Sequence, residues 1–162
     1  MHKGEMEVLL ARHLNYRANL IVPNVSWGLG IHEVDMLILS SSNYASEIEI
    51  KISLSDLKAD LKKPHGHHSD KIKKLYFAIP KELEEKALEF IPERAGLFVV
   101  NDSYTRNGRQ VKPYVVLSKA PKSNPTARKL NDKEIKKLYE LAAMRIWSLK
   151  EVVYRLQKEN NE

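Results

Sequence analysis

The chain has 162 residues, a formal net charge of +6 and a pI near 9.4; 43% of its residues are hydrophobic, 30% are charged and none is cysteine. This length suits one domain with a buried core, and this composition excludes a disordered tail and a disulfide framework. No apolar run reaches the roughly 18–20 residues of a membrane helix, and no signal-peptide core follows Met1, so we expect a cytoplasmic protein with no membrane partner.

The first third of the chain is predicted to form a helix followed by strands. Apolar residues at helical spacing predict a helix over about residues 5–16, and the segment around Pro23 is expected to be extended before a glycine-containing turn. Residues 34–39 (VDMLIL) are typical of a buried strand, although they contain one acid. Residues 47–52 (EIEIKI) alternate polar and apolar side chains with period two, which is a strand signal.

The middle of the chain is predicted to form a short helix, a core strand and a second helix. Ser53 and Asp56 match a capping box, in which a hydroxyl and a carboxylate three residues later satisfy free backbone amides. A helix is therefore expected over about residues 54–63, ending before Pro64. Residues 74–79 (KLYFAI) predict a core strand, and the following Pro80 suits the first turn of a helix to about residue 90.

The last third is predicted to form a hairpin and a long helix. Residues 96–101 and 114–117 have strand character, and Asn107-Gly108 between them is a strong turn signal. Asn131 or Asp132 can cap a final helix over about residues 131–157. The order of elements predicts an α/β fold, a mixed β-sheet flanked by helices with a long C-terminal helix, in a single domain over 1–162 with its core at about 5–120.

Polar residues on the two strands at 34–39 and 47–52 form the most informative pattern. Glu47, Glu49 and Lys51 are two residues apart and therefore share one face of their strand. Asp35 is a lone acid in an apolar strand, so Asp35 and Glu49 converge if the two strands pair as a hairpin. The alternation is also typical of a half-exposed strand with a solvated face. However, an unpaired acid in a buried strand is costly and usually has a reason.

A converging acid pair beside a lysine suits the hydrolysis of a phosphodiester. Mg²⁺ prefers one or two carboxylates together with waters and substrate oxygens. Asp35 and Glu49 are the predicted carboxylate ligands of Mg²⁺ (or Mn²⁺), and the carbonyl of Ile50 is a further candidate ligand. Lys51 is placed to orient the attacking water or to stabilise charge in the transition state.

A longer run of residues resembles a known family. An Asp, a loop and then Glu-x-Lys on the next strand resemble the PD-(D/E)XK nuclease superfamily. The segments 49–63, 74–80 and 91–97 resemble the MmcB-like, DNA-repair-associated group of that superfamily, and the similarity covers about residues 5–150. The resemblance implies a restriction-endonuclease-like core, dependence on Mg²⁺ and action on DNA.

The resemblance carries over to individual positions. Asp35, Glu49 and Lys51 match the core motif, whereas Val34 stands where the motif's name places proline. Many members of the superfamily have a further acid on the first helix, for which Glu7 is our choice and Glu5 the alternative. The resemblance supports DNA processing better than any particular cleavage reaction.

Basic and histidine residues near this region have open roles. The positive charge favours a polyanionic partner, and Lys58 and Lys62, one turn apart, could grip DNA phosphates or simply solvate a helix face. His65-Gly66-His67-His68 invites a zinc hypothesis, but nothing else is spaced for a zinc site, so we interpret it as a polar loop with His68 as a candidate DNA contact. Trp27 and Trp147 could stack on bases, but tryptophans in a chain of this size are more often core residues, so we expect both in the core.

The leading hypothesis is a metal-dependent DNA endonuclease in repair or recombination. The alternative is a non-catalytic DNA-binding accessory module that retains the nuclease fold, and a third interpretation is a structural domain with incidental charge. Relatives of such folds often act as dimers, so a homodimer with the final helix as its interface stays open. DNA preference, internal or end cleavage and the number of metals are not determined by the sequence.

Overall fold

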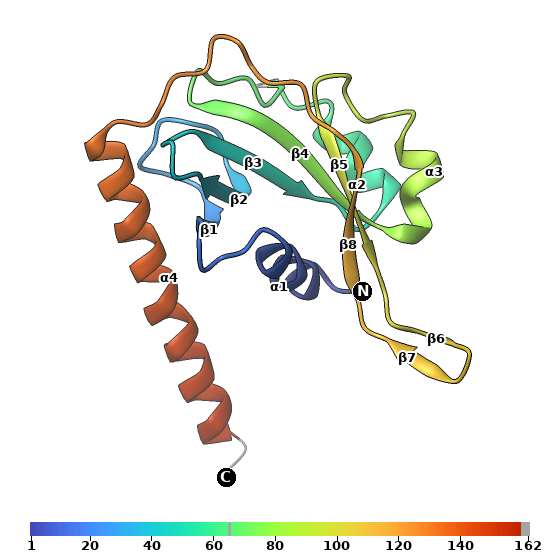
Figure 1. Cartoon of the computed structure of the whole chain (residues 1–162). Coiled ribbons are helices and arrows are strands. Elements are labelled where there is room, and N and C mark those ends of the chain that lie inside the picture. The colour runs from blue at the N-terminus through green and yellow to red at the C-terminus, as the bar shows by residue number, and fades with distance from the viewer. Residues whose placement is uncertain (65, 160–162) are drawn as a thin grey trace.

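A computed structural model describes residues 1–64 and 66–159. Its centre is a six-stranded sheet with the strand order β1-β2-β3-β4-β5-β8, and a separate two-stranded hairpin joins β5 to β8 (Figure 1). The sheet strands are β1 (Leu20–Val25), β2 (Val34–Leu39), β3 (Ala45–Ile50), β4 (Ile72–Pro80), β5 (Gly96–Asn101) and β8 (Tyr114–Lys119). The hairpin strands are β6 (Tyr104–Arg106) and β7 (Arg109–Val111), and the helices are α1 (Lys3–His13), α2 (Leu54–Asp60), the 3-10 turn η1 (Lys81–Leu83), α3 (Glu84–Ala87) and α4 (Asp132–Glu159).

The sheet is mixed, as the order of elements predicts. β1, β2 and β3 pair antiparallel, β3, β4 and β5 pair parallel, and β8 returns antiparallel to β5. The predicted α/β fold with a mixed sheet, flanking helices and a long C-terminal helix is therefore confirmed. Because β3, β4 and β5 are parallel, their last residues, Ile50, Pro80 and Asn101, lie at the same edge of the sheet.

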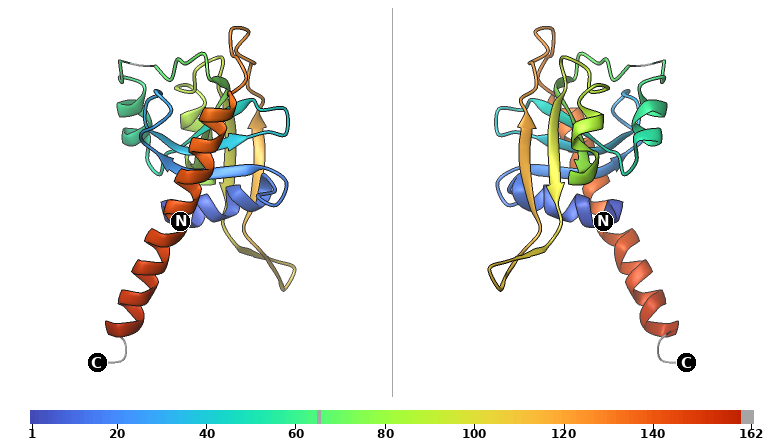
Figure 2. Two further views of the ribbon diagram at one scale, coloured as in Figure 1. Left: turned by 90° about the vertical axis from the view of Figure 1, so that its left-hand side faces the viewer. Right: turned by 90° about the vertical axis from the view of Figure 1, so that its right-hand side faces the viewer.

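The helices cover both faces of the sheet. Met6 and Leu10 of α1 pack on one face, against a cluster that includes Met36, Ile48 and Ala78. On the opposite face, α2 and α3 cover β4 and β5 through the cluster that contains Leu57, Leu75, Phe77, Ala87 and Leu97. Figure 2 shows α1 and α4 in side view, with the β6–β7 hairpin projecting from the body. The centre of the sheet is thus closed on both sides.

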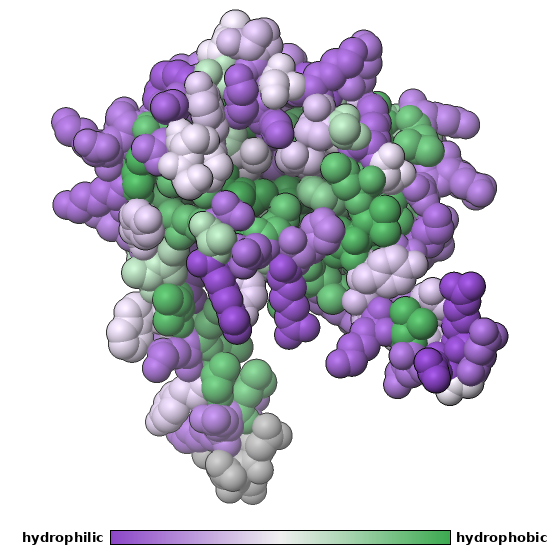
Figure 3. Space-filling model, in the orientation of Figure 1, coloured by the Kyte–Doolittle hydropathy of each residue, from purple (hydrophilic) through white to green (hydrophobic). Residues whose placement is uncertain are grey.

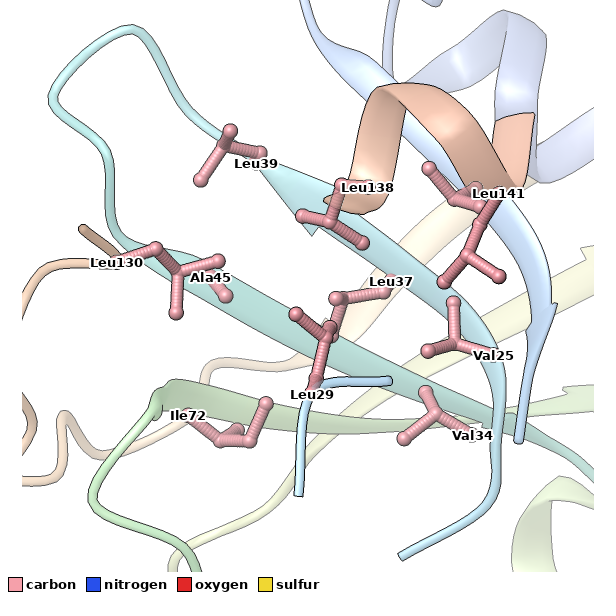
Figure 4. Close-up of a cluster of buried hydrophobic side chains, with 11 residues drawn as sticks. Val25, Leu29, Val34, Leu37, Leu39, Ala45, Ile72, Leu130, Leu138 and Leu141 are labelled. Carbon is pink, nitrogen blue, oxygen red and sulfur yellow. The ribbon is translucent and has the colours of Figure 1, made fainter. Parts of the chain in front are cut away.

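The first half of α4 is anchored in the core and the second half is not. Leu138 and Leu141 are buried against Val25, Val34 and Leu37 of the β1–β2 end of the sheet (Figure 4). Beyond this contact the helix extends away from the body (Figures 1 and 2). No helix in the described parts of the chain has both the length and the apolar character that crossing a bilayer requires.

Several local predictions were wrong. In place of the helix predicted over 80–90, the chain forms one turn of 3-10 helix and the four-residue α3. Ala87 is the only buried residue in these two segments, so little packing supports a longer helix. Ile52, the last residue of the strand predicted over 47–52, follows the end of β3 and is 50% exposed. Trp27 and Trp147 are also exposed, at 50% and 66%. Trp27 lies beyond β1 and Trp147 lies on the unanchored half of α4, so neither reaches a cluster.

Candidate active site

Glu47 and Glu49 lie in the middle of the sheet and are fully buried. β3 is paired on both edges, with Glu47 between Leu37 of β2 and Leu75 of β4. The two glutamates share the face covered by α2, while Ile48 and Ile50 pack beneath α1 on the other. Exposed fractions of 0% for Glu47 and 2% for Glu49 contradict the interpretation of this strand as a half-exposed one with a solvated face.

Asp35 lies at the start of β2, next to the end of β3. Its Oδ2 accepts a hydrogen bond of 2.8 Å from the backbone N–H of Ile50, and its Oδ1 accepts one of 2.6 Å from Lys3 Nζ. The pKa of Glu49 is raised above its ordinary value, chiefly by burial and in addition by the negative charges of Asp35 and Glu47, although Lys51 opposes the shift. The hairpin pairing of β2 and β3 therefore brings Asp35 and Glu49 together.

Lys51 lies between two carboxylates. Its Nζ donates hydrogen bonds to Glu49 Oε2 at 2.8 Å and to Asp60 Oδ1 at 2.9 Å, and its side chain is only 6% exposed. Burial alone would lower the pKa of this amine, but the charges and hydrogen bonds of Glu49 and Asp60 outweigh burial and raise it. Lys51 is consequently a cation at neutral pH and acts as a hydrogen-bond donor, not as a base.

The two candidate acids of the first helix lie in different surroundings. Glu7 is half-buried, and its pKa is raised by burial and by the charge of Asp35, against the opposing charge of Lys3. Glu5 is exposed and lines a groove between α1 and the start of β8, with Arg12. The placement of the two side chains thus favours Glu7 as the acid next to Asp35.

The acid pair fits a divalent cation. Glu49 Oε1 is buried and has no hydrogen-bond partner among the described residues. The ammonium group of Lys3, whose side chain is 43% exposed, holds one oxygen of Asp35. Asp35 is 15% exposed, compared with 3% for Glu49, so the site opens to solvent on the side of Asp35 and Lys3. A buried carboxylate oxygen without a donor is the feature that a cation would satisfy.

Asp60 and His67 belong to the same network, and the sequence analysis did not assign them to it. His67 donates through Nε2 to Asp60 Oδ2 at 2.6 Å, and its Nδ1 lies 2.6 Å from Glu47 Oε1. Burial disfavours the charged imidazole, but the hydrogen bonds and charges of Asp60 and Glu47 prevail and raise the pKa of His67 to about 9. The sequence indicates the burial of Asp60 only through helical spacing: Asp60 lies three positions after the core residue Leu57, on the same face of α2.

The interpretation of 65–68 as a polar loop was wrong for His67. His67 is 3% exposed, and its ring lies edge-on to His32 and to Phe77. The expectation that no other residue completes a metal site was also wrong, because His32, Glu47 and His67 form a candidate metal-binding group. His65 lies outside the described residues.

The predicted DNA contacts are on the surface. Lys58 and Lys62 are exposed, and the Lys58 ammonium lies 4.4 Å from the ring centroid of Phe90. His68 is exposed beside the start of β4, where it lines a pocket with Lys73 and Arg94. These placements leave all three side chains accessible to a ligand.

The fold and this arrangement define the class of protein: an α/β protein with a mixed sheet in which two adjacent strands carry Asp35 and the Glu49-x-Lys51 pattern. The chain belongs to the MmcB-like DNA repair protein family, which matches residues 8–151. Comparison with curated proteins finds no match.

A solved structure, that of a protein of unknown function from Silicibacter pomeroyi, is similar with a TM-score of 0.62 and 19% sequence identity. The similarity covers 97% of this chain and 94% of that one. At this level of identity the likeness shows a common fold alone.

Proposed function

We propose that this protein is a Mg²⁺- or Mn²⁺-dependent DNA endonuclease that acts in DNA repair or recombination. The observation that supports this proposal most directly is the convergence of Asp35, Glu49 and Lys51 at the adjoining ends of β2 and β3. Membership of a DNA repair family supports DNA as the substrate.

Each residue of the site has a distinct role in this proposal. Asp35 and Glu49, with the carbonyl of Ile50, would hold the cation, which supplies Lewis-acid stabilisation and activation of water when bound. The backbone N–H of Ile50 orients Asp35. Lys51, held by Glu49 and Asp60, presents a fixed positive charge that orients the attacking water and stabilises the charge developing on the phosphate.

Basic side chains extend from the same edge of the sheet. The β6–β7 hairpin continues from the end of β5, and its Arg106, Arg109 and the following Lys112 are exposed. The hairpin is largely hydrophilic in Figure 3. Lys58 lies on α2, which starts near this edge because it follows β3 directly in the chain. These residues are suitable contacts for a phosphate backbone.

The cleavage experiment uses purified wild-type protein with single-stranded, duplex and branched DNA, each with Mg²⁺ or Mn²⁺. Asp35→Ala and Lys51→Ala are each expected to reduce cleavage by roughly 10²–10³-fold or more, since each removes a group that acts on the transition state. Glu7→Gln is expected to reduce cleavage and Glu5→Gln to leave it unchanged. Every variant is checked for a circular dichroism spectrum like that of the wild type, so that a loss of cleavage is not caused by a loss of the fold.

Undiminished cleavage by folded Asp35→Ala and Lys51→Ala would rule out this site. An equal loss of cleavage in Glu7→Gln and Glu5→Gln would contradict the assignment of Glu7 and would indicate an effect on α1 as a whole.

A second candidate function is a non-catalytic DNA-binding accessory module, and the burial of the site favours it. Glu49 and Lys51 have exposed side-chain fractions of 3% and 6%, and Glu49 Oε2 forms an ion pair with Lys51. An accessory module is expected to bind DNA with a strong dependence on salt and to cut none of the three substrates. Arg106→Ala is then expected to weaken binding at all sequences, whereas Lys133→Ala, at the opposite edge of the sheet, serves as a control.

A further inference from the structure

A second group of metal-binding side chains lies on the same face of β3 as the acid pair, and the proposed function does not use it. His32 Nε2 lies 2.8 Å and His67 Nδ1 lies 2.6 Å from the same oxygen, Glu47 Oε1. The donor atoms of the three side chains all lie within 4.8 Å of one another. Three donors that converge on one point from three separate segments are the elementary requirement for a metal centre.

The three side chains are enclosed. Their exposed fractions are 7% for His32, 0% for Glu47 and 3% for His67. His32 lies in the connection between β1 and β2, and His67 lies in the connection between α2 and β4. The described residues next to each histidine belong to no helix or strand, so the positions of these two histidines on the sheet depend on side-chain contacts such as these.

Glu47 carries a charge that the described contacts satisfy only in part. Its Oε1 has two imidazole partners, but its Oε2 is buried with no hydrogen-bond partner among the described residues. A buried carboxylate with an unsatisfied oxygen destabilises the fold unless a cation or a hydrogen-bond donor compensates it. A divalent ion bound at this point would supply that compensation.

Asp60 provides the outer contact that metal-binding histidines have. Its Oδ2 accepts a hydrogen bond of 2.6 Å from His67 Nε2, which leaves His67 Nδ1 facing Glu47. A carboxylate on the distal nitrogen fixes the orientation and tautomer of a ligating imidazole, and such pairs recur around zinc. The cluster therefore contains both a ligand set and its supporting shell.

We propose that His32, Glu47 and His67 supply the three protein ligands of one Zn²⁺ ion, with water in the fourth position, at a site separate from the Asp35–Glu49 site. Two imidazole nitrogens and one carboxylate oxygen suit Zn²⁺, whereas Mg²⁺ is held mainly by oxygen ligands. The ion fastens the β1–β2 and α2–β4 connections to the centre of β3. Through His67 and Asp60 it also steadies Lys51, which Asp60 holds at 2.9 Å.

The first experiment measures zinc binding by the full chain. Wild-type protein is stripped with a chelator, dialysed and titrated with Zn²⁺ in competition with a chromophoric chelator. One ion per chain is expected, with a rise in Tm on loading. X-ray absorption of the loaded protein is expected to show nitrogen and oxygen neighbours at about 2.0–2.1 Å and no sulfur.

Variants assign the ligands. His32→Gln and Glu47→Gln are expected to abolish stoichiometric binding, and Asp60→Asn to weaken it by roughly 10–100-fold as an outer contact. His68→Gln is the matched control, because His68 is an exposed histidine adjacent to His67. Asp35→Ala is expected to keep full zinc affinity while it loses cleavage. The zinc proposal and the nuclease proposal are therefore tested by different measurements, and either can be contradicted without the other.

Two outcomes overturn the proposal. The first is absence of stoichiometric binding by the wild type, which would make the three side chains an ion-pair cluster only. The second is unchanged binding in folded His32→Gln and Glu47→Gln. If either variant does not fold, the wild type loaded with Co²⁺ decides, since a site of this kind gives the visible absorption of tetrahedral Co²⁺ and its absence contradicts the assignment.

Discussion

At the scale of single residues, Lys3 holds the position beside Asp35 that a metal cation would take. Its Nζ lies 2.6 Å from Asp35 Oδ1, and its own side chain is 43% exposed. A cation that binds Asp35 must displace this ammonium group or share the carboxylate with it. We therefore expect Lys3 to compete for Asp35 with the cation of the proposed site.

Replacement of this competitor is expected to strengthen metal binding. An exposed ion pair contributes roughly 0.2–1 kcal/mol, so Lys3→Met should lower the Kd for Mn²⁺ by up to about fivefold. Calorimetric titration of the zinc-saturated protein with Mn²⁺ measures the change. Lys62→Met, at an exposed lysine of similar size, is the control. An unchanged Kd in Lys3→Met would show that the lysine does not compete for Asp35.

Glu47, Glu49 and Lys51 are buried charged side chains, so their replacement affects stability. Lys51 pairs with Glu49 and Asp60, and His67 pairs with Glu47 and Asp60. Removal of one of these side chains therefore takes a partner from a buried charge. Loss of one member of a buried ion pair is strongly destabilising. Variants at these positions therefore need a stability measurement beside any activity assay.

At the scale of elements, the start of α4 is defined by a reciprocal cap. Glu134 N–H donates to Asn131 Oδ1 at 3.0 Å, and Asn131 N–H donates to Glu134 Oε2 at 2.9 Å. Of the two candidate caps considered from the sequence, Asn131 is therefore the residue that caps the helix. Arg128 adds a bidentate contact to Glu134 at 2.8 and 2.7 Å.

This cap predicts a pH dependence of stability. Hydrogen bonds from Arg128 and Asn131 lower the pKa of Glu134 from its ordinary value of 4.5 to about 2, in spite of opposing burial. Because the folded pKa is the lower one, the stabilisation is complete above about pH 4.5 and is lost as the pH falls towards 2. Glu134→Gln should lower the free energy of unfolding by about 1 kcal/mol at pH 7.

Urea denaturation at pH 7, 4 and 3 measures this effect. The difference between wild type and Glu134→Gln is expected to shrink as the pH falls. Glu140→Gln, on the exposed side of the same helix and 3.4 Å from Lys137, should show a much smaller difference throughout. A wild-type advantage that stays constant from pH 7 to pH 3 would contradict the role of the Glu134 carboxylate.

At the scale of the whole molecule, the second half of α4 exposes an apolar stripe. Ile146, Leu149, Val153 and Leu156 are 56%, 63%, 50% and 53% exposed. Their spacing of three, four and three residues repeats as in a coiled coil. Figure 3 shows hydrophobic side chains on this part of the helix, which stands clear of the body. A helix with this spacing is self-complementary and suits packing against its copy in a second chain.

We expect the protein to form a homodimer through this stripe. Sedimentation equilibrium at micromolar concentrations should give the mass of two chains for the wild type and of one chain for the double variant Leu149→Ser and Val153→Ser. The fold should survive, because Leu138 and Leu141 anchor the other half of α4. Met144→Ser, an exposed apolar residue on the opposite side of the helix, is the control.

A wild type that sediments as one chain would remove this interface. Dimers that persist in the double variant would place the contact on another surface.

The positions of the strands along the chain and the acid pair were predictable from local sequence patterns. Alternation and apolar runs identified β2, β3, β4 and β5 to within a few residues, because period two is a local property of a strand. The short turn between β2 and β3 made hairpin pairing the natural arrangement, and that pairing brings Asp35 to Glu49. The helix at 80–90 was mispredicted because packing, rather than propensity, decides how far a short helix continues.

The α/β fold, the family resemblance and the pairing of Asp35 with Glu49 and Lys51 could be predicted from the sequence, since each is carried by local patterns: strand periodicity, short motifs and the turn between β2 and β3. The burial of Glu47 and Glu49 could not be predicted in this way, because it depends on which elements of the folded chain cover the centre of the sheet. The packing of the chain also brings His32 and His67 to Glu47. The histidines reach Glu47 from irregular connections 15 and 20 residues away, whose paths follow from packing and have no sequence period of their own.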